Sequence, residues 1–281
     1  MLFRSLMRAL NDNHPEVFRE VIQKPYRDFL KLPRISPEVF AVYKRQFDYE
    51  QRPLEAKTLK TDDSDPDLTY EWIEYNAAYN QERMSGILFK PKNVTGKLPA
   101  IIYFPGSNLI HTREIEKVTL GQIPRSFIKM GHALFFPIYK GTVNRADGLK
   151  SDYSDVSDFY KEHVIMWGKD MKRSIDLMAT RPELDLSNLI YFGVSWGGEM
   201  GNIMIPIEDR IRRAVLLVAG LNFEEAQPEV EAYQYTPYIK IPVLMLNGKY
   251  DFFFPVETSQ KPMFQRSEEH TSELQSLAYL V

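Results

Sequence analysis

The chain has 281 residues, of which 44% are hydrophobic and 26% are charged, and it contains no cysteine. This length and composition are typical of a globular protein with one large core. The formal net charge of −3 gives no reason to expect nucleic acid or an anionic membrane surface as a partner. The lack of cysteine excludes disulfides, a thiol nucleophile and a cysteine-ligated zinc site.

Residues 6–68 are predicted to form a mainly helical N-terminal segment that several prolines interrupt. Four apolar residues in it follow the i, i+3, i+4, i+8 spacing of an amphipathic helix: Val39, Val42, Tyr43 and Phe47. Residues 1–5 resemble translated DNA of a sequencing-library adapter, and we expect them not to be native sequence. Such segments are left out of fold prediction.

From residue 69 the pattern changes to alternating strands and helices. An antiparallel hairpin is predicted first, at residues 70–78 and 83–90. Apolar runs that predict buried strands follow at residues 98–104, 132–138, 189–192, 214–219 and 243–246. Helical patterns separate them at residues 118–130, 161–180 and 197–207. This succession predicts an α/β fold with a mostly parallel sheet and helices on both faces.

The most informative motif is Gly-Val-Ser-Trp-Gly-Gly at residues 193–198, between a predicted strand and a predicted helix. A strand, a Gly-x-Ser-x-Gly turn and a helix form the nucleophile elbow of an α/β-hydrolase. Glycine at 193 and at 197 permits close approach of neighbouring backbone, and the helix N-terminus favours an oxyanion. Ser195 is therefore the predicted nucleophile. The alternative is a glycine-rich turn without chemistry.

A serine nucleophile needs a histidine base and a carboxylate that orients the histidine. In this fold the chain order is serine, then acid, then histidine. Asp251 follows the predicted strand 243–246 and comes after Ser195, so it is the predicted acid. An ordinary turn aspartate is the alternative.

The histidine is missing from the expected place. Four histidines precede Ser195, namely His14, His111, His132 and His163. His270 follows Asp251, but it lies in residues 266–281, which resemble translated sequencing adapter. We therefore expect residues 69–265 to be an incomplete, C-terminally truncated α/β-hydrolase domain with an exposed apolar edge beside residues 243–246. We also expect this chain to be almost inactive.

Backbone N–H groups are predicted to form the oxyanion hole. One comes from Trp196, after the nucleophile, and the other from Ser107 in the loop after an earlier strand, where Gly106 permits close approach. A simple Pro-Gly turn is the alternative for this loop. Tyr139 and Asn108 are predicted to shape the substrate pocket at the same rim. No metal and no organic cofactor is expected.

The segments at residues 103–107, 137–142, 193–198 and 246–255 carry a resemblance that extends over about residues 24–264. The chain resembles the α/β-hydrolases of the dienelactone hydrolase and acetyl-xylan-esterase-like group. It is most similar to a bacterial subgroup whose hydrolase domain follows a serine/threonine kinase-like domain. The resemblance implies serine at Ser195 where dienelactone hydrolases proper carry cysteine, which argues against lactone hydrolysis. It also implies a Gly-His after Asp251.

These observations predict that the parent protein is a serine hydrolase, a carboxylesterase acting on small acyl esters. The expected partner is a small-molecule ester, with no nucleic acid and no membrane, and with an upstream kinase-like domain in the longer protein. A cytoplasmic location is expected. One alternative is a serine peptidase of the prolyl oligopeptidase type, which shares the Gly-x-Ser-x-Gly-Gly elbow. The other is a non-catalytic regulatory domain of a kinase-like protein.

Overall fold

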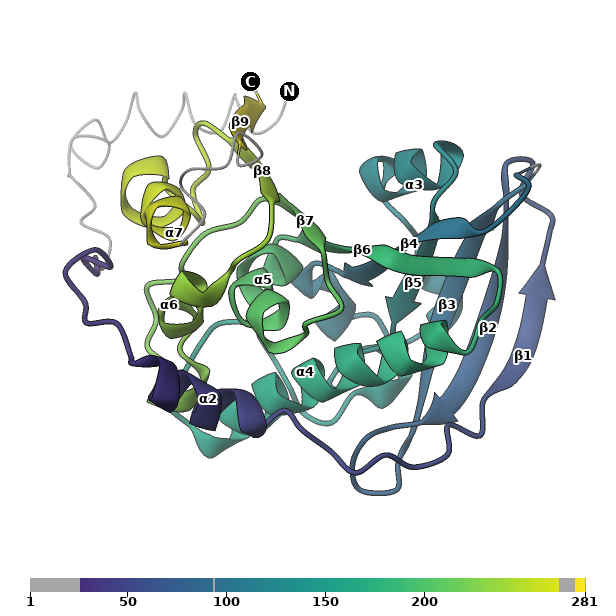
Figure 1. Cartoon of the computed structure of the whole chain (residues 1–281), viewed down its shortest axis with the longest axis horizontal. Helices are drawn as coiled ribbons and strands as arrows, with labels where there is room; N and C mark the ends of the chain where they lie inside the picture. The colour runs from purple at the N-terminus through teal and green to yellow at the C-terminus, as the bar shows by residue number, and fades with distance from the viewer. Residues whose placement is uncertain (1–25, 93, 268–275, 281) are drawn as a thin grey trace, which may run out of the picture.

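The computed structural model describes residues 26–92, 94–267 and 276–280 (Figure 1). Within these residues a nine-stranded sheet has the order β1-β2-β3-β5-β4-β6-β7-β8-β9. The strands are β1 (Lys57–Asp62), β2 (Leu68–Asn76), β3 (Arg83–Pro91), β4 (Leu98–Phe104), β5 (Ala133–Pro137), β6 (Leu184–Val194), β7 (Arg213–Leu217), β8 (Val243–Gly248) and β9 (Ser276–Leu280). The β1–β2, β2–β3 and β3–β5 pairs are antiparallel, and the other neighbouring pairs are parallel.

Helices cover both faces of the sheet, with α4 and α5 on one face and α3 on the other (Figure 1). The α-helices are α2 (Pro37–Arg45), α3 (Gln122–Lys129), α4 (Asp158–Ala179), α5 (Trp196–Ile207), α6 (Ala232–Tyr235) and α7 (Lys261–Arg266). Short turns of 3₁₀ or π type lie at η1 (Ser107–Ile110), η2 (Ile115–Lys117), η3 (Val143–Arg145), η4 (Pro228–Val230), η5 (Thr236–Tyr238) and η6 (Val256–Gln260). None of the described helices combines the length and apolar character needed to cross a bilayer. The predicted α/β-hydrolase fold is confirmed.

The core has one layer on each side of the sheet, and strand β4 shows why. Successive side chains of a strand point to opposite faces. Ile102 and Phe104 belong to the larger cluster beneath α4 and α5. Ile101 and Tyr103 belong to the second cluster, which also holds Ile128 of α3. A continuous apolar run therefore fills both layers, as expected for a central parallel strand.

The N-terminal segment is attached to the domain through Phe47, just after α2. Phe47 is fully buried, whereas Val39 and Val42 on α2 are 38% and 52% exposed. Gly168 of α4 makes room for this ring, because a Cβ there would lie 2.4 Å from Phe47 Cδ1. The predicted helix is present, but its apolar spacing overstates how much of it is buried.

Strand β1 was not predicted, because residues 6–68 were expected to be mainly helical. Its sequence, Lys-Thr-Leu-Lys-Thr-Asp, has no apolar alternation, and nearly all of it is exposed. It pairs with β2 and is irregular between Thr58 and Lys60. Charged side chains and an irregular register are common on edge strands, where they oppose pairing with other chains. Residues 6–25 of the segment lie outside the described residues.

At the other end of the sheet, β9 pairs in parallel with β8, from Leu244 opposite Ser276 to Gly248 opposite Leu280. The prediction of an exposed apolar edge beside residues 243–246 is therefore wrong. Residues 1–5 and 268–275, the latter with His270, lie outside the described residues. The non-native origin of residues 266–281 and the C-terminal truncation stay predictions.

Replacement of Phe47 should show that the N-terminal segment contributes to the stability of the domain. We expect Phe47→Ala to lower the free energy of unfolding by about 3–5 kcal/mol, because it leaves a cavity beside Gly168. Val42→Ala, at an exposed position of α2, should change it by less than about 0.5 kcal/mol. Urea unfolding measures both values. Equal effects would mean that the segment does not pack on the domain in solution.

Candidate active site

Ser195 lies on a strained turn between β6 and α5. Its φ and ψ are 53° and −110°, a conformation that is unfavourable for a residue with a side chain. The Ser195 N–H donates to the Leu217 carbonyl of β7 over 2.8 Å. The turn is thus held by the neighbouring strand, and the predicted strand, turn and helix are all present.

The two glycines of the motif are needed because backbone atoms approach them closely. A Cβ at Gly193 would lie 2.1 Å from the Gly197 carbonyl oxygen. A Cβ at Gly197 would lie 2.1 Å from the Phe104 carbonyl oxygen at the end of β4. The Gly197 N–H donates to the Pro105 carbonyl over 3.0 Å. The first turn of α5 therefore packs directly on the loop that follows β4.

That loop brings a second backbone donor to the nucleophile. A Cβ at Gly106 would lie 3.7 Å from Ser195 Cβ, so the loop passes beside the serine. Ser107 is the first residue of η1 and Trp196 is the first residue of α5. The first N–H groups of a helix have no partner within it, and no described residue accepts a hydrogen bond from either of these two. Both remain available to an oxyanion beside Ser195.

The side chain of Trp196 packs beneath the Ser195 turn, against aromatic rings of β4 and α4. It is fully buried. Its ring meets the rings of Phe104 and Trp167 edge-on, at centroid distances of 4.9 Å and 4.7 Å. Edge-to-face contacts of this kind add stability beyond the area they bury. The indole therefore ties α5 to both β4 and α4.

Ser195 and Ser107 line two neighbouring cavities, of about 420 Å³ and 480 Å³. The first is also lined by Asp152, Tyr153, Glu199, Asn222, Phe223, Glu224, Phe252, Phe253 and Phe254. The second is lined by Tyr103, Pro105, Gly106, Asn108, Leu109, Thr119, Gly121, Phe136 and Val194. Volumes in this range suit small-molecule ligands. The predicted position of Asn108 beside the nucleophile agrees with this lining.

Tyr139 does not line either of these cavities, contrary to the prediction. Its side chain is fully buried and stacks on Phe104 at a centroid distance of 4.0 Å. Its hydroxyl donates to the Tyr103 carbonyl over 3.2 Å. A tyrosine at the end of a strand has the right place in the sequence for a pocket, but here its ring faces the core.

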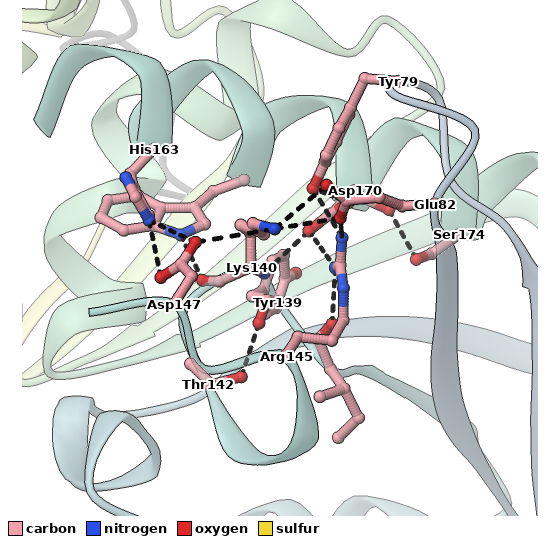
Figure 2. A network of polar contacts seen from close by, with 12 residues as sticks. Tyr79, Glu82, Tyr139, Lys140, Thr142, Arg145, Asp147, His163, Asp170 and Ser174 are labelled. Carbon is pink, nitrogen blue, oxygen red and sulfur yellow. Dashed lines mark hydrogen bonds and ion pairs between the residues drawn. The ribbon is translucent and has the colours of Figure 1, made fainter. Parts of the chain in front are cut away.

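A network of polar groups links residues 138–147 to α4, in the stretch of chain before Asp152 and Tyr153 (Figure 2). Arg145 pairs with the fully buried Asp170 of α4 over 2.5 Å and donates to the Ile138 carbonyl over 2.9 Å. The Asp170 contact joins Arg145 to α4, and the Ile138 contact closes the turn within residues 138–145.

His163 belongs to the same network. Its Nε2 lies 3.0 Å from Asp147 Oδ2, and its Nδ1 donates to the Phe159 carbonyl over 2.8 Å. His163 is therefore a buried residue with structural contacts. His132 packs on Phe127 with a ring-centroid distance of 6.0 Å.

Asp251 follows β8, as predicted, but it makes only local contacts. Its Oδ1 accepts the N–H groups of Phe253 and Phe254, over 2.8 Å and 3.0 Å. This is the turn role that we weighed as the alternative. Among the described residues no histidine bonds to Ser195 or Asp251, and His270 lies outside them. The described part of the chain thus holds the elbow and the two N–H groups predicted to be oxyanion donors, but not a complete triad.

Asn247 fixes the end of β8 relative to the loop after β7. It is fully buried, its Oδ1 accepts the Ala219 N–H over 2.7 Å, and its Nδ2 donates to the Ala219 carbonyl over 3.0 Å. The side chain thus satisfies a backbone N–H and a backbone carbonyl that would otherwise lack hydrogen bonds in the interior. Asn247 therefore holds the end of β8 beside the loop after β7, and sequence analysis did not identify it.

Glu199 is the functional candidate that sequence analysis missed. It lies one turn after Ser195 on α5, is 2% exposed, and lines the first cavity. Its Oε1 has no hydrogen-bond partner among the described residues. Burial raises the pKa of this carboxyl well above its ordinary value, nearby Asp152 raises it further, and the Asn222 side chain acts in the opposite direction. The sequence signal was available, because Glu199 is the one ionisable residue of α5.

No group of three or more metal-ligating side chains is placed to hold a metal ion within the described residues.

The chain belongs to the dienelactone hydrolase family, whose sequence profile matches residues 84–275. Its fold is similar to that of acetyl xylan esterase 1 from Thermoanaerobacterium sp., with a TM-score of 0.63, 15% identity, and coverage of 92% of this chain and 89% of the other. An acetyl xylan esterase from Paenibacillus sp. is similar with a TM-score of 0.64 and 17% identity, and the match covers 89% of this chain and 90% of the other. A putative dienelactone hydrolase from Klebsiella pneumoniae is similar with a TM-score of 0.52 and 19% identity, and the match covers 75% of this chain and 85% of the other. At these identities the likeness shows the fold alone. No curated protein matches the chain.

The close contact at Gly197 can be tested by adding one methyl group. We expect Gly197→Ala to lower the free energy of unfolding by at least about 1–3 kcal/mol, because the new Cβ meets a backbone oxygen that cannot rotate away. Gly121→Ala is the matched control, since its nearest neighbour would be Pro124 Cδ at 3.8 Å, an ordinary contact. Urea unfolding compares the two. If both were tolerated equally, the packing of α5 on β4 would be looser than described.

The raised pKa of Glu199 predicts a pH dependence of stability. Its pKa in the folded protein is raised from the ordinary 4.5, so above that value the folded protein keeps a proton that the unfolded chain releases. The free energy of unfolding should therefore fall as pH rises, by at most about 1.4 kcal/mol per pH unit for this group. Glu199→Gln should flatten this slope between about pH 5 and pH 7.

Urea unfolding at several pH values measures the slope. Glu225→Gln, at an exposed acid beside the cavity, should leave it unchanged. A Glu199→Gln slope equal to that of the unsubstituted protein would show that Glu199 is ionised in the folded state.

Proposed function

We propose that this member of the dienelactone hydrolase family is a serine hydrolase that acts as a carboxylesterase on small acyl esters. The observation that carries the proposal is the strained turn at Ser195, which opens on a small-molecule cavity beside two unpartnered N–H groups. The strain supports this proposal, because a residue in such a conformation lowers stability by about 1–3 kcal/mol and residues of this kind cluster at active sites.

In the proposed mechanism the Ser195 hydroxyl attacks the acyl carbon of the ester. The N–H groups of Trp196 and Ser107 hold the oxyanion, which carries the charge that develops in the transition state. A histidine takes the serine proton and gives it to the departing alcohol, and water then releases the acyl group by the same steps in reverse. Asp251 is the proposed acid that orients this histidine. Its Oδ2 accepts no hydrogen bond from a described residue, whereas Oδ1 is used by the turn.

The histidine base is the part that the described residues do not supply. His111, His132 and His163 precede the nucleophile, and two of them have structural contacts elsewhere. We propose that the base comes from native sequence after Asp251, beyond residue 265. Loss of the base lowers the rate about as much as loss of the serine, since the triad acts as a unit. The chain of 281 residues should therefore show only the residual catalysis of an oxyanion hole, roughly 10³–10⁴ over water.

Ester hydrolysis and active-site labelling test the function. The chain with its native continuation after residue 265 should hydrolyse p-nitrophenyl acetate and react with a fluorophosphonate probe. Ser195→Ala should remove both, with a loss of about 10⁶ in kcat. In the chain of 281 residues, His270→Ala should leave the residual rate unchanged. A rate that disappeared with His270→Ala would show that residues 266–281 provide the base.

The other outcomes of this experiment identify the competing functions. Cleavage of a prolyl anilide in place of the acetyl ester would indicate a peptidase. A folded protein that neither hydrolysed the ester nor reacted with the probe would be a non-catalytic domain, and the proposal would be wrong.

A further inference from the structure

Three carboxyl groups line the cavity that opens on Ser195, and nothing positive lines it with them. Asp152 comes from the loop before α4, Glu199 from α5, and Glu224 from the loop after β7. Among the described residues no lysine, arginine or histidine lines this cavity. None of the three carboxyl groups forms an ion pair within the described part of the chain. Most of the other carboxylates in the described residues do have a cationic partner.

Glu199 shows that the acidity is built into the interior and is not only a surface property. Its side chain is 2% exposed. The Asn222 side chain interacts with it, but Oε1 has no hydrogen-bond partner among the described residues. A buried polar atom without a hydrogen bond destabilises a protein unless a ligand completes it. An atom of this kind, beside the nucleophile and at a cavity wall, is a site for a donor group of the substrate.

Aromatic side chains form much of the remaining wall. Tyr153 and Phe253 are 50% and 61% exposed, and Phe223 and Phe254 line the same cavity. The face of an aromatic ring attracts cations, and a cage of such rings beside a carboxylate is the common way in which proteins bind alkylammonium groups. Hydrophobic walls with excess negative charge therefore favour one class of ligand, an organic cation.

We propose that the substrate of this site is an ester that carries an alkylammonium group, with its ammonium end held between Glu199, Asp152, Glu224 and the aromatic wall. The inference rests on the proposed esterase function, because it places the ester carbon of that substrate at Ser195. A bound ammonium group supplies the opposite charge that favours the ionised form of Glu199. It also gives the three carboxyl groups the counter-charge that the protein itself does not provide.

A binding experiment tests this without the catalytic base. Choline and 3,3-dimethylbutanol have the same shape and differ in one positive charge. Isothermal titration of the chain at low ionic strength should give a dissociation constant for choline that is at least about tenfold lower than for 3,3-dimethylbutanol. Added salt should weaken the binding of choline and not that of the neutral alcohol.

Two substitutions identify the groups responsible. Glu199→Gln keeps the shape of the buried side chain, and Glu224→Gln changes an exposed position. Each should reduce the preference for choline by at least about fivefold. Glu225→Gln is the matched control, because it removes the same charge from the next residue, which does not line the cavity. It should keep the preference of the unsubstituted chain.

Equal affinities for choline and 3,3-dimethylbutanol would overturn the inference, as would a preference that neither Gln variant reduces. So would binding of a neutral polyol that Glu199→Gln abolishes, since Glu199 would then act as an uncharged hydrogen-bond donor. Ester hydrolysis without a preference for choline would contradict this inference alone. A preference for choline without hydrolysis or fluorophosphonate labelling would contradict the proposed function and leave the ammonium site in place.

Discussion

The close packing of the first turn of α5 against the end of β4 determines the rest of the site. Gly197 lies so near the Phe104 carbonyl that no side chain fits, and its N–H bonds to the Pro105 carbonyl. Because α5 starts this close to the sheet, the chain must turn sharply from β6, and Ser195 takes a positive φ. The same contact brings the loop of Gly106 beside Ser195. The positions of the two predicted oxyanion donors and of both cavities follow from this close packing of α5 on β4.

The parts of the site that depend on local chain geometry could be predicted from the sequence. The glycine pattern around Ser195 specifies a turn of this shape, and the apolar run of β4 specifies a strand buried on both faces. The loop after β4 was predicted for the same reason, since Pro105 and Gly106 mark a turn that follows a buried strand. In each case the residues that make the structure are neighbours in the chain.

The parts that were missed or wrong depend on residues far apart in the sequence. Strand β1 carries no apolar period and forms only because β2 offers a free edge. Tyr139 was expected at the pocket, but its ring lies in the core, where it stacks on Phe104. The pairing of β9 with β8 closes an edge that was expected to be open. Each outcome depends on a partner element whose position the local sequence does not specify.

The acid at position 251 shows where chain order alone is a weak guide. Asp251 stands in the expected place after β8, yet its Oδ1 stabilises the turn that presents Phe253 and Phe254 to the cavity. One carboxyl group can serve both purposes, because an aspartate has two oxygens and several acceptor sites. The turn therefore leaves Oδ2 of Asp251 for its proposed role as the acid, and it forms a wall of the cavity.

An oxyanion beside three carboxyl groups raises an electrostatic difficulty for the proposed esterase. Negative charge close to the developing oxyanion opposes the stabilisation that Trp196 and Ser107 offer, and the effect is largest in a cavity that excludes water. Burial relieves part of it, because it raises the pKa of Glu199 and so disfavours the ionised form of this carboxyl. An ammonium group on the substrate relieves the rest, since it brings positive charge into the cavity with the ester itself. A cavity of this kind would be a poor site for an anionic ester, so its charge acts against such substrates as well as in favour of cationic ones.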